Sequence, residues 1–506
     1  MLPLGSTTTA IKASERKIST KATIMNNAPS ENRSSQENRF FNYGMNQRGN
    51  TPRYLFLYRQ IRDDILNGRI HPGEKLPSKR QLAKALSVGV LTVENAYHQL
   101  LLEGYIESKQ RSGYFANNVG RALEINKTEL DSAAEELEAE SETFNTDLQA
   151  NRAVAHEFPV ATWFKLLRKV IAENPADLFD TVPYNGLIEL RKAIAAYLLR
   201  ARGMHVSPSQ IIIGAGTEYL YSRLIQLLDP AATFVFENPG YQKLSRIADN
   251  YHVPWTYCNV DKSGMMINRL RKTDGTVVHV SPANNFPGGF TMSAQRRREL
   301  LRWANEDDSR YIIEDDYDSE LRFEGNPLLP LFANDAHEKV IYLNTFSKTL
   351  MPSLRISYMI LPKHLMKRYQ ETMSFYSCTV SGFEQRALAK FIDEGYFERH
   401  IAHLRNHYRK QREAVMSAVR NSDLASISRI IENNAGTHFL LVLETSYTAR
   451  EIKQAVAQHG INLALLNDYC FKDYPVAKKT LVVNYASLSA DEVEETVNKL
   501  AAALAR

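Results

Sequence analysis

A lysine and an arginine seven residues apart lie in a stretch rich in hydroxyl side chains, NTFSKTLMPSLRISY, residues 344–358. A neutral lysine amine attacks aldehydes, and hydroxyl groups together with an arginine fork can grip a phosphate. Thr345 and Ser347 supply hydroxyls beside Lys348, and Arg355 supplies the fork. The stretch is therefore suited to holding a phosphorylated aldehyde as an imine of the lysine.

A carboxylate before this lysine fits the same chemistry. Asp315 closes the stretch RYIIED, residues 310–315, which contains a short apolar run. Tyr317 comes two residues later. A carboxylate at a strand end can keep a pyridine nitrogen protonated, which makes the ring an electron sink. Four carboxylates crowd into residues 314–318, so an acidic loop or a metal cluster is the alternative.

Two further turns complete the set. Gly216, Thr217 and Glu218 follow the run QIIIGA and open a helix, where backbone N–H groups can hold a phosphate. Tyr241 follows TFVFENPG and is placed to stack on a flat ring, although a buried structural tyrosine fits equally well. The order of glycine turn, tyrosine, carboxylate, lysine and arginine favours one cofactor site.

The elements that must position these groups alternate between helix and strand. After Phe158, short Val/Ile-rich runs alternate with helical segments over more than 200 residues. This alternation of strands and helices predicts a mostly parallel sheet with helices on both faces. Such sheets bind ligands at the carboxyl ends of their strands. We expect a large α/β domain over residues 158–375 and a smaller α+β domain over 376–506.

Residues 51–118 predict a DNA-binding domain. A first amphipathic helix ends at Gly68, Ser78 and Gln81 form a capping box, and a third helix runs from about Val90 to Glu103. An alternating pattern around KQRSG predicts a β-hairpin. Three helices and a hairpin make a winged helix-turn-helix, which places a helix in the major groove. DNA contacts are expected from Lys79, Arg80, Thr92, Asn95, His98, Lys109 and Arg111.

Charge is distributed unevenly along a chain of net charge +5. Residues 53–118 carry ten Lys/Arg against six Asp/Glu, whereas residues 119–152 carry three against nine. A basic block followed by an acidic one indicates a nucleic-acid module on a linker that does not compete for DNA, although a solvated helix face gives similar counts. We expect an acidic linker over residues 119–157 and a disordered extension over residues 1–50, which are rich in Ser, Thr and Asn.

The composition excludes several classes. Three cysteines among 506 residues are too few and too scattered for a disulfide framework or a zinc site, so no metal is expected and a reducing, cytoplasmic location is favoured. The sequence has no run of about 18 apolar residues, so no membrane span is expected.

The chain resembles the MocR family of bacterial transcription regulators over nearly all residues beyond 50. Residues 53–118 resemble the GntR-type winged helix, and residues from about 160 to 506 resemble fold-type I aminotransferases, which use pyridoxal 5′-phosphate (PLP). The motifs EDDYDSE and TFSKTLMPSLR are specific to that family. The resemblance implies a multidomain homodimer, with an N-terminal winged helix-turn-helix (α+β) and an α/β fold-type I PLP-dependent transferase domain.

The resemblance also implies roles for the site residues. Lys348 would carry the Schiff base with PLP, Asp315 would pair with the pyridine nitrogen and Tyr317 would bond the ring hydroxyl. The remaining residues expected around the cofactor are Tyr241 on the ring face, Asn285 nearby, Gly216, and the phosphate-binding Thr217, Glu218 (backbone), Thr345, Ser347 and Arg355.

Departures from the family pattern bear on function. Phe286 stands where aminotransferases have an asparagine, Val482 stands where an arginine clamps a substrate carboxylate, and Lys243 stands where amino-acid-sensing members tend to have arginine. An unpaired carboxylate in a closed site is costly, so these departures favour a sensor of PLP over an enzyme. In the DNA module, Gly89 and Val90 replace the Ser-Arg that often begins a GntR recognition helix.

The sequence thus predicts a regulator that binds a double-stranded DNA operator and takes PLP, or a PLP-linked amine, as effector, in control of vitamin B6 metabolism. The alternatives are a PLP-dependent aminotransferase with an appended DNA module, a regulator sensing an amino acid such as GABA, and a degenerate domain that only dimerises. Retention of Lys348, Asp315 and Arg355 together argues against the last of these.

Overall fold

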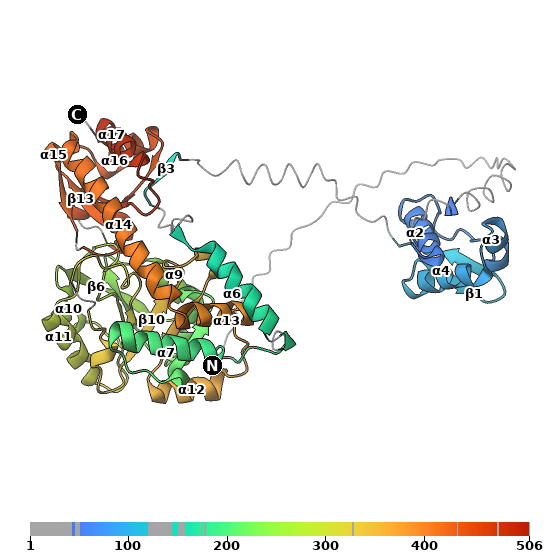
Figure 1. The fold of residues 1–506 in the computed structure, drawn as a ribbon, viewed down its shortest axis with the longest axis horizontal. Helices are drawn as coiled ribbons and strands as arrows, with labels where there is room; N and C mark the ends of the chain where they lie inside the picture. The colour runs from blue at the N-terminus through green and yellow to red at the C-terminus, as the bar shows by residue number, and fades with distance from the viewer. Residues whose placement is uncertain are drawn as a thin grey trace, which may run out of the picture. The chain divides into compact units, whose positions relative to one another are not determined.

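The chain divides into two compact units, residues 1–141 and residues 142–506 (Figure 1). The structure is a computed structural model, and it describes residues 43–45, 51–119, 144–149, 157–173, 175–176, 179–325, 328–432, 434–472 and 475–504. None of the helices in these ranges combines the length and the apolar character that a membrane span requires.

The smaller unit is the predicted winged helix-turn-helix. Ser78 and Gln81 form the expected capping box at the start of its second helix, and Tyr97 donates a hydrogen bond to the carbonyl oxygen of Pro77 (2.8 Å). Apolar residues of all three helices form one core, which the hairpin closes through Ile106 and Ala116. The elements are α2 (Arg53–Leu66), α3 (Lys79–Ala85), α4 (Val90–Leu102), β1 (Ile106–Lys109) and β2 (Gly113–Ala116).

The larger unit is built on an eight-stranded sheet in the order β4-β11-β10-β9-β8-β5-β6-β7. The central pairs β10–β9, β9–β8, β8–β5 and β5–β6 are parallel, as predicted, whereas β11 runs antiparallel to both of its neighbours. The strands are β4 (Ile211–Gly214), β5 (Phe234–Asn238), β6 (Trp255–Asp261), β7 (Gly264–Met265), β8 (Val277–Val280), β9 (Tyr311–Asp315), β10 (Val340–Thr345) and β11 (Ser357–Ile360).

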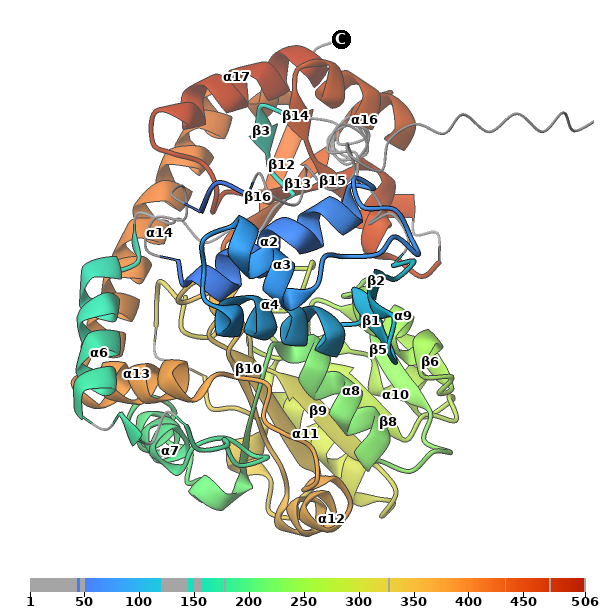
Figure 2. The same ribbon diagram turned by 90° about the vertical axis from the view of Figure 1, so that its right-hand side faces the viewer.

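Helices cover both faces of this sheet (Figure 2). Successive side chains of a strand point to opposite faces, so Ile211 and Ile213 pack into one core while Ile212 packs into the other. This double burial explains why these strands read as continuous apolar runs. One core contains residues of α6 (Val160–Glu173), α7 (Ile188–Arg202) and α13 (Gly382–Asp393), and the other contains residues of α8 (Thr217–Leu227), α9 (Lys243–Asn250) and α12 (Lys363–Met373).

The C-terminal part forms a second, four-stranded sheet in the order β12-β13-β16-β15. Its strands are β12 (Ser428–Ile431), β13 (His438–Leu443), β15 (Ala464–Leu465) and β16 (Thr480–Asn484), and the accompanying helices are α14 (Tyr396–Asn421), α16 (Ala449–Gln458) and α17 (Glu492–Leu504). Its core is continuous with the α7–α13 side of the large sheet, because Phe439 and Leu481 belong to the same cluster as Ile211.

Two short segments differ from the expected extension and linker. Tyr43, within the predicted extension, is buried against the winged helix and donates a hydrogen bond to Asp64 (2.8 Å). Thr146 and Asp147, within the predicted linker, form β3 and pair with β14 (Ile461–Asn462). Leu148 is buried beside them, and an apolar side chain gains from leaving water, so this part of the linker packs on the larger unit. Apart from residues 43–45, 119, 144–149 and 157, the predicted extension and linker lie outside the described residues.

A buried ion pair ties α7 to the end of β9. The guanidinium of Arg202 lies 2.7 Å from a carboxylate oxygen of Asp316, and both side chains are almost fully buried. Asp316 also accepts a hydrogen bond from the hydroxyl of Tyr342 (2.7 Å). The neighbouring Arg200 pairs with Glu398 at the same 2.7 Å, but on the surface.

Replacing Arg202 with methionine would leave the Asp316 carboxylate buried without its partner. Loss of one partner of a buried pair costs about 3–5 kcal/mol, so we expect the free energy of unfolding of the larger unit to fall by that amount. The control Arg200→Met should cost about 1 kcal/mol or less, because its ion pair is solvent-exposed.

Urea denaturation followed by tryptophan fluorescence would measure both variants. The three tryptophans of the chain, Trp163, Trp255 and Trp303, all lie in the larger unit, so the signal reports that unit alone. Equal losses in the two variants would contradict a special role of the buried pair.

Candidate functional site

A cavity of about 440 Å³ opens at the carboxyl ends of β5, β8, β9 and β10. Its far wall comes from the C-terminal sheet, through Val482 and Asn484 of β16 and His438 of β13. Ten of the eleven residues predicted around the cofactor line it: Gly216, Thr217, Glu218, Tyr241, Asp315, Tyr317, Thr345, Ser347, Lys348 and Arg355.

One end of the cavity is built to attract an anion. Helix α8 begins at Thr217 with no side-chain cap, so its first backbone N–H groups are open, and Arg355 reaches toward the same turn. Gly216 makes this approach possible: a Cβ atom there would lie 2.5 Å from a guanidinium nitrogen of Arg355, and its φ is +94°. Ser347 adds a buried hydroxyl. These groups together form a phosphate-sized anion site.

Glu218 partly neutralises this end in the absence of a ligand. Its carboxylate accepts hydrogen bonds from Lys243 and from Arg355 (3.3 Å), and the Lys243 ammonium holds the pKa of Glu218 below its usual value. Lys243 is thus engaged in an ion pair at the rim. Glu218 would share Arg355 with an incoming anion.

The opposite end is built around Asp315. Burial raises the pKa of this carboxyl to about 7, since the nearby Lys348 offsets only part of the desolvation and Asp316 and Asp318 add negative charge. His279 lies 3.7 Å from it, but burial lowers the pKa of His279 to about 3, so the imidazole is neutral. A cationic ring nitrogen placed here would supply the missing counter-charge.

Lys348 lies between the two ends. Its ammonium nitrogen is 3.4 Å from a carboxylate oxygen of Asp318 and 4.6 Å from the centre of the Tyr317 ring. Its side chain is 26% exposed, whereas that of Asp318 is fully buried. The lysine amine is therefore accessible from the cavity and is oriented by a carboxylate behind it.

Five buried polar atoms on the cavity wall have no hydrogen-bond partner among the described residues. Buried polar groups in folded proteins are almost always paired, so five unpaired groups on side chains that line one cavity favour a polar ligand there. They are Glu237 Oε1, His279 Nδ1, Tyr317 OH, Ser347 Oγ and His438 Nε2.

Sequence reasoning missed three of these side chains and misplaced one residue. Glu237 and His279 lie inside apolar strands, and His438 comes from the distant C-terminal sheet. Asn285 does not line the cavity: it donates to Glu237 Oε2 (2.8 Å) and accepts from the Gly288 N–H (3.2 Å). Its position beside Phe286 suggested a cofactor contact, but the side chain is fully buried and its amide supports Glu237.

One wall of the cavity is aromatic. The ring of Phe286 makes edge contacts with Tyr241 (6.1 Å), His438 (5.5 Å) and Tyr469 (5.0 Å between ring centres). Among the described residues that line the cavity, Arg355 is the one arginine, and it belongs to the anion end. The aromatic wall therefore offers no guanidinium to a second anionic group.

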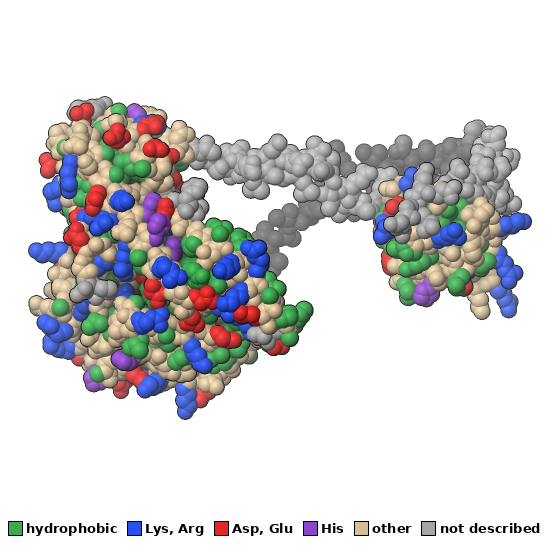
Figure 3. All heavy atoms as spheres, viewed as in Figure 1, with side chains coloured by type: hydrophobic (Ala, Val, Ile, Leu, Met, Phe, Trp, Pro, Cys, Tyr) green, Lys and Arg blue, Asp and Glu red, His purple; other side chains and the backbone are tan. Residues whose placement is uncertain are grey.

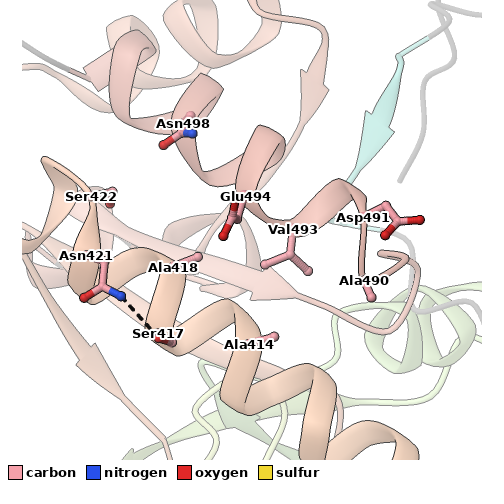
Figure 4. A pocket seen from close by; sticks show the side chains of 10 residues that line it. All are labelled: Ala414, Ser417, Ala418, Asn421, Ser422, Ala490, Asp491, Val493, Glu494 and Asn498. Carbon is pink, nitrogen blue, oxygen red and sulfur yellow. Dashed lines mark hydrogen bonds between the residues drawn. The ribbon is translucent and has the colours of Figure 1, made fainter.

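A second hollow lies between α14 and α17 (Figure 4). It is lined mainly by small and polar side chains, among them Ser417, Ala418 and Asn498. Its acidic side chains, Asp491 and Glu494, are exposed to solvent. Since its described polar groups are not buried, this groove lacks the unpaired polar atoms that distinguish the cavity above.

The predicted DNA contacts lie on α3, α4 and the hairpin of the smaller unit, where Lys and Arg side chains reach the surface (Figure 3). Arg80, Asn95, His98, Lys109 and Arg111 are exposed and Thr92 is half-buried. Lys79 instead pairs with Glu94 (2.7 Å), which ties α3 to α4.

Comparison with known proteins agrees with this two-part organisation. Residues 53–115 match the family of bacterial regulatory proteins of the gntR type, and residues 129–500 match the aminotransferase class I and II family. Kynurenine aminotransferase of Pyrococcus horikoshii superposes with a TM-score of 0.64 at 24% identity, covering 76% of this chain and 96% of that one, a likeness of fold.

Curated relatives share both parts. The HTH-type transcriptional regulator YdeL of Bacillus subtilis is 37% identical, over 91% of this chain and 98% of its own length. The probable rhizopine catabolism regulatory protein MocR of Rhizobium meliloti is 30% identical (89% and 94%), and the pyridoxine biosynthesis regulator PdxR of Corynebacterium glutamicum is 31% identical (82% and 88%). The molecule is a transcriptional regulator with a GntR winged helix and an aminotransferase-like domain. Within that class, the chain belongs to the MocR family.

The raised pKa of Asp315 predicts a pH-dependent stability. The folded protein holds a proton on this carboxyl up to about pH 7, whereas the unfolded chain releases it near pH 4, so the contribution of Asp315 becomes unfavourable as pH rises between these values. Asp315→Asn should therefore stabilise the ligand-free protein by roughly 2–4 kcal/mol at pH 8 and by little at pH 4.

Urea denaturation at both pH values, followed by tryptophan fluorescence, would test this expectation. Asp308→Asn is the control, because that side chain is fully exposed. A stability difference between wild type and Asp315→Asn that is the same at pH 4 and pH 8 would refute the assignment of a raised pKa to Asp315.

Proposed function

We propose that the cavity binds PLP and that PLP acts as the effector of DNA binding by the winged helix. The observation that carries the proposal is the convergence in one cavity of an anion site, a lysine amine, a buried carboxylate and five unpaired polar atoms. PLP carries a phosphate, an aldehyde, a pyridine nitrogen and a ring hydroxyl, so each part of the cofactor has a matching group.

Each matching group has a distinct role. Gly216, the start of α8 and Arg355 would hold the phosphate, with the hydroxyl of Ser347 beside them. Asp315 would pair with the ring nitrogen, and the unpaired hydroxyl of Tyr317 would bond the ring hydroxyl. Lys348 would bond the aldehyde carbon. When bound, PLP supplies a reactive aldehyde and an electron-withdrawing ring.

Two features favour sensing over transamination. Phe286 and Val482 occupy the wall where an amino-acid substrate would place its carboxylate, and that wall has no arginine among the described residues. A carboxylate buried there would lose its hydration without gaining an ion pair. The relative PdxR is a regulator of pyridoxine biosynthesis, which further supports a role in vitamin B6 metabolism.

An aminotransferase remains the second candidate, because Lys348 and Asp315 are both present in a fold that the solved aminotransferases share. It predicts that an amino-acid donor converts the bound cofactor to its amine form and yields an oxo acid. The sensing proposal predicts that no oxo acid accumulates.

The chain segment that leads toward the N-terminal unit forms part of the cavity wall. Leu148 and Gln149 line the cavity directly after β3, and the Leu148 carbonyl accepts a hydrogen bond from the backbone N–H of Asn484 (3.1 Å). A ligand in the cavity would touch this segment. Ligand binding would therefore favour one position of the segment from which the chain leads to the winged helix. Such differential contact is what a ligand needs to shift a conformational equilibrium.

We also propose that the chain acts as a homodimer, which would present two winged helices to two DNA half-sites. Helix α6 supports this, because Val160, Phe164 and Ile171 are 44%, 55% and 49% exposed and recur at helical spacing on one side of the helix. An aliphatic and aromatic stripe of this kind is typical of a subunit interface.

Mixing ligand-free protein with PLP should produce a cofactor absorbance band that survives dialysis in the wild type and is lost in Lys348→Ala. Borohydride reduction should fix the cofactor to the peptide that contains Lys348, as mass spectrometry would reveal.

Arg355→Met should weaken PLP binding about 10- to 100-fold, since it removes a charged partner of the phosphate. The exposed Lys363→Ala is the control. Cofactor fixed to another lysine would disprove the assignment.

Coupling between cavity and DNA binding can be tested through Gln149→Ala. Coupled sites typically change each other's affinity by roughly 5- to 150-fold. We expect saturating PLP to change DNA affinity in the wild type and to change it less in Gln149→Ala, with the PLP concentration set to saturate each protein. Thr146→Ala is the control, because Thr146 lies in β3, three residues before Gln149, and does not line the cavity. Fluorescence anisotropy of labelled DNA, with and without PLP, measures both effects.

A further inference from the structure

The recognition helix carries two exposed aliphatic side chains at its start. In α4, Val90 is 46% exposed and Leu91 is 68% exposed. The buried face of the helix is formed by Val93, Ala96 and Tyr97, together with Leu100. Leu91 lies on the opposite, outward face with Asn95 and His98, which follow it by four and by seven residues.

This outward face is the surface that meets DNA. Helix α4 is the second helix of the α3–α4 pair, and in helix-turn-helix proteins the N-terminal residues of this helix contact base edges in the major groove. Exposed Arg80 and Arg111 flank the pair on α3 and on the hairpin, and positive charge there matches DNA phosphates. Leu91 is therefore presented to the bases with polar and cationic neighbours around it.

The side chain of leucine can read one kind of feature in the major groove. It has no donor or acceptor, so it gains nothing from the nitrogen and oxygen atoms of base edges. The C5-methyl group of thymine is the one apolar group that standard bases present there. Gly89, just before the helix, has no side chain, and a Cβ atom built there meets only Thr92 Oγ1, at 3.9 Å, so the start of α4 has room to approach the groove.

We propose that Leu91, assisted by Val90, is a specificity-determining residue that reads thymine methyl groups in the DNA site. The inference goes beyond the proposed function and depends only on DNA binding by the winged helix, so it stands or falls independently of the ligand in the cavity. It gives a role in base recognition to the start of a helix where Gly89 and Val90 replace the Ser-Arg that many GntR-type helices have.

The test begins with a random-sequence duplex library, from which the full-length protein selects its preferred site. Each thymine of that site is then replaced by uracil, which removes the methyl group and leaves the base-pairing edge intact. At one or two thymines in each half-site, uracil should weaken wild-type binding about four-fold, roughly the factor for burying one methyl group. Fluorescence anisotropy at fixed salt measures the affinities.

Leu91→Ala should bind the selected site more weakly and should lose the sensitivity to uracil at those same thymines. Leu102→Ala is the matched control, because Leu102 is 74% exposed at the far end of the same helix, eleven residues on. It should keep wild-type affinity and full uracil sensitivity. Affinity for a random duplex should be the same in all three proteins, which shows that the variants are folded.

Three outcomes would overturn the proposal. Uracil could leave wild-type binding unchanged at every thymine. Leu91→Ala could weaken binding yet keep the uracil effect, which would assign Leu91 to a protein contact between DNA-bound subunits. Leu102→Ala could reproduce the effect of Leu91→Ala, which would make exposed leucine on α4 a general contributor with no base preference.

Discussion

The negative charge buried at the end of β9 constrains the rest of the larger unit. Successive side chains of a strand point to opposite faces, so the carboxylates at the end of β9 lie on different sides, and each has different partners. Glu314 accepts two backbone N–H groups, from Leu331 (2.7 Å) and Phe332 (2.9 Å), and Asp316 pairs with Arg202. Asp318 faces Lys348, and Asp315 faces the cavity with a neutral histidine beside it. Of these four acids, Asp315 is the one that lines the cavity, and burial raises its pKa to about 7.

This arrangement couples stability to ligand binding. A buried carboxyl with a raised pKa costs free energy in the ligand-free protein, and a bound cation beside it removes that cost. Any ligand that binds only the folded state stabilises it by mass action. The site therefore lowers the stability of the ligand-free protein and raises the affinity for the ligand. The same groups serve an enzyme or a sensor, and our proposal of a sensor depends on the wall that includes Phe286 and Val482.

Much of the fold followed from local patterns. Helical spacing and the Ser78–Gln81 capping box predicted α2 to α4, and apolar runs predicted the buried strands β4, β5, β8, β9 and β10. Strand-end position placed Asp315 and Lys348 at one cavity, because parallel strands bring their carboxyl ends to the same edge of a sheet. The antiparallel direction of β11 had no local signal, since an apolar run does not reveal its direction.

By itself, the sequence determined the two-part organisation, the lysine and arginine of the cavity and the face of α4 that points outward, because these follow from spacing along a single element. Tertiary packing alone decided which of Asn285 and Phe286 reaches the cavity, and it brought in Glu237, His438 and Gln149. Gln149 arrives through the pairing of β3 with β14, more than 300 residues away along the chain. Contacts between such distant segments depend on how the cores pack, and local sequence pattern carries no record of that packing.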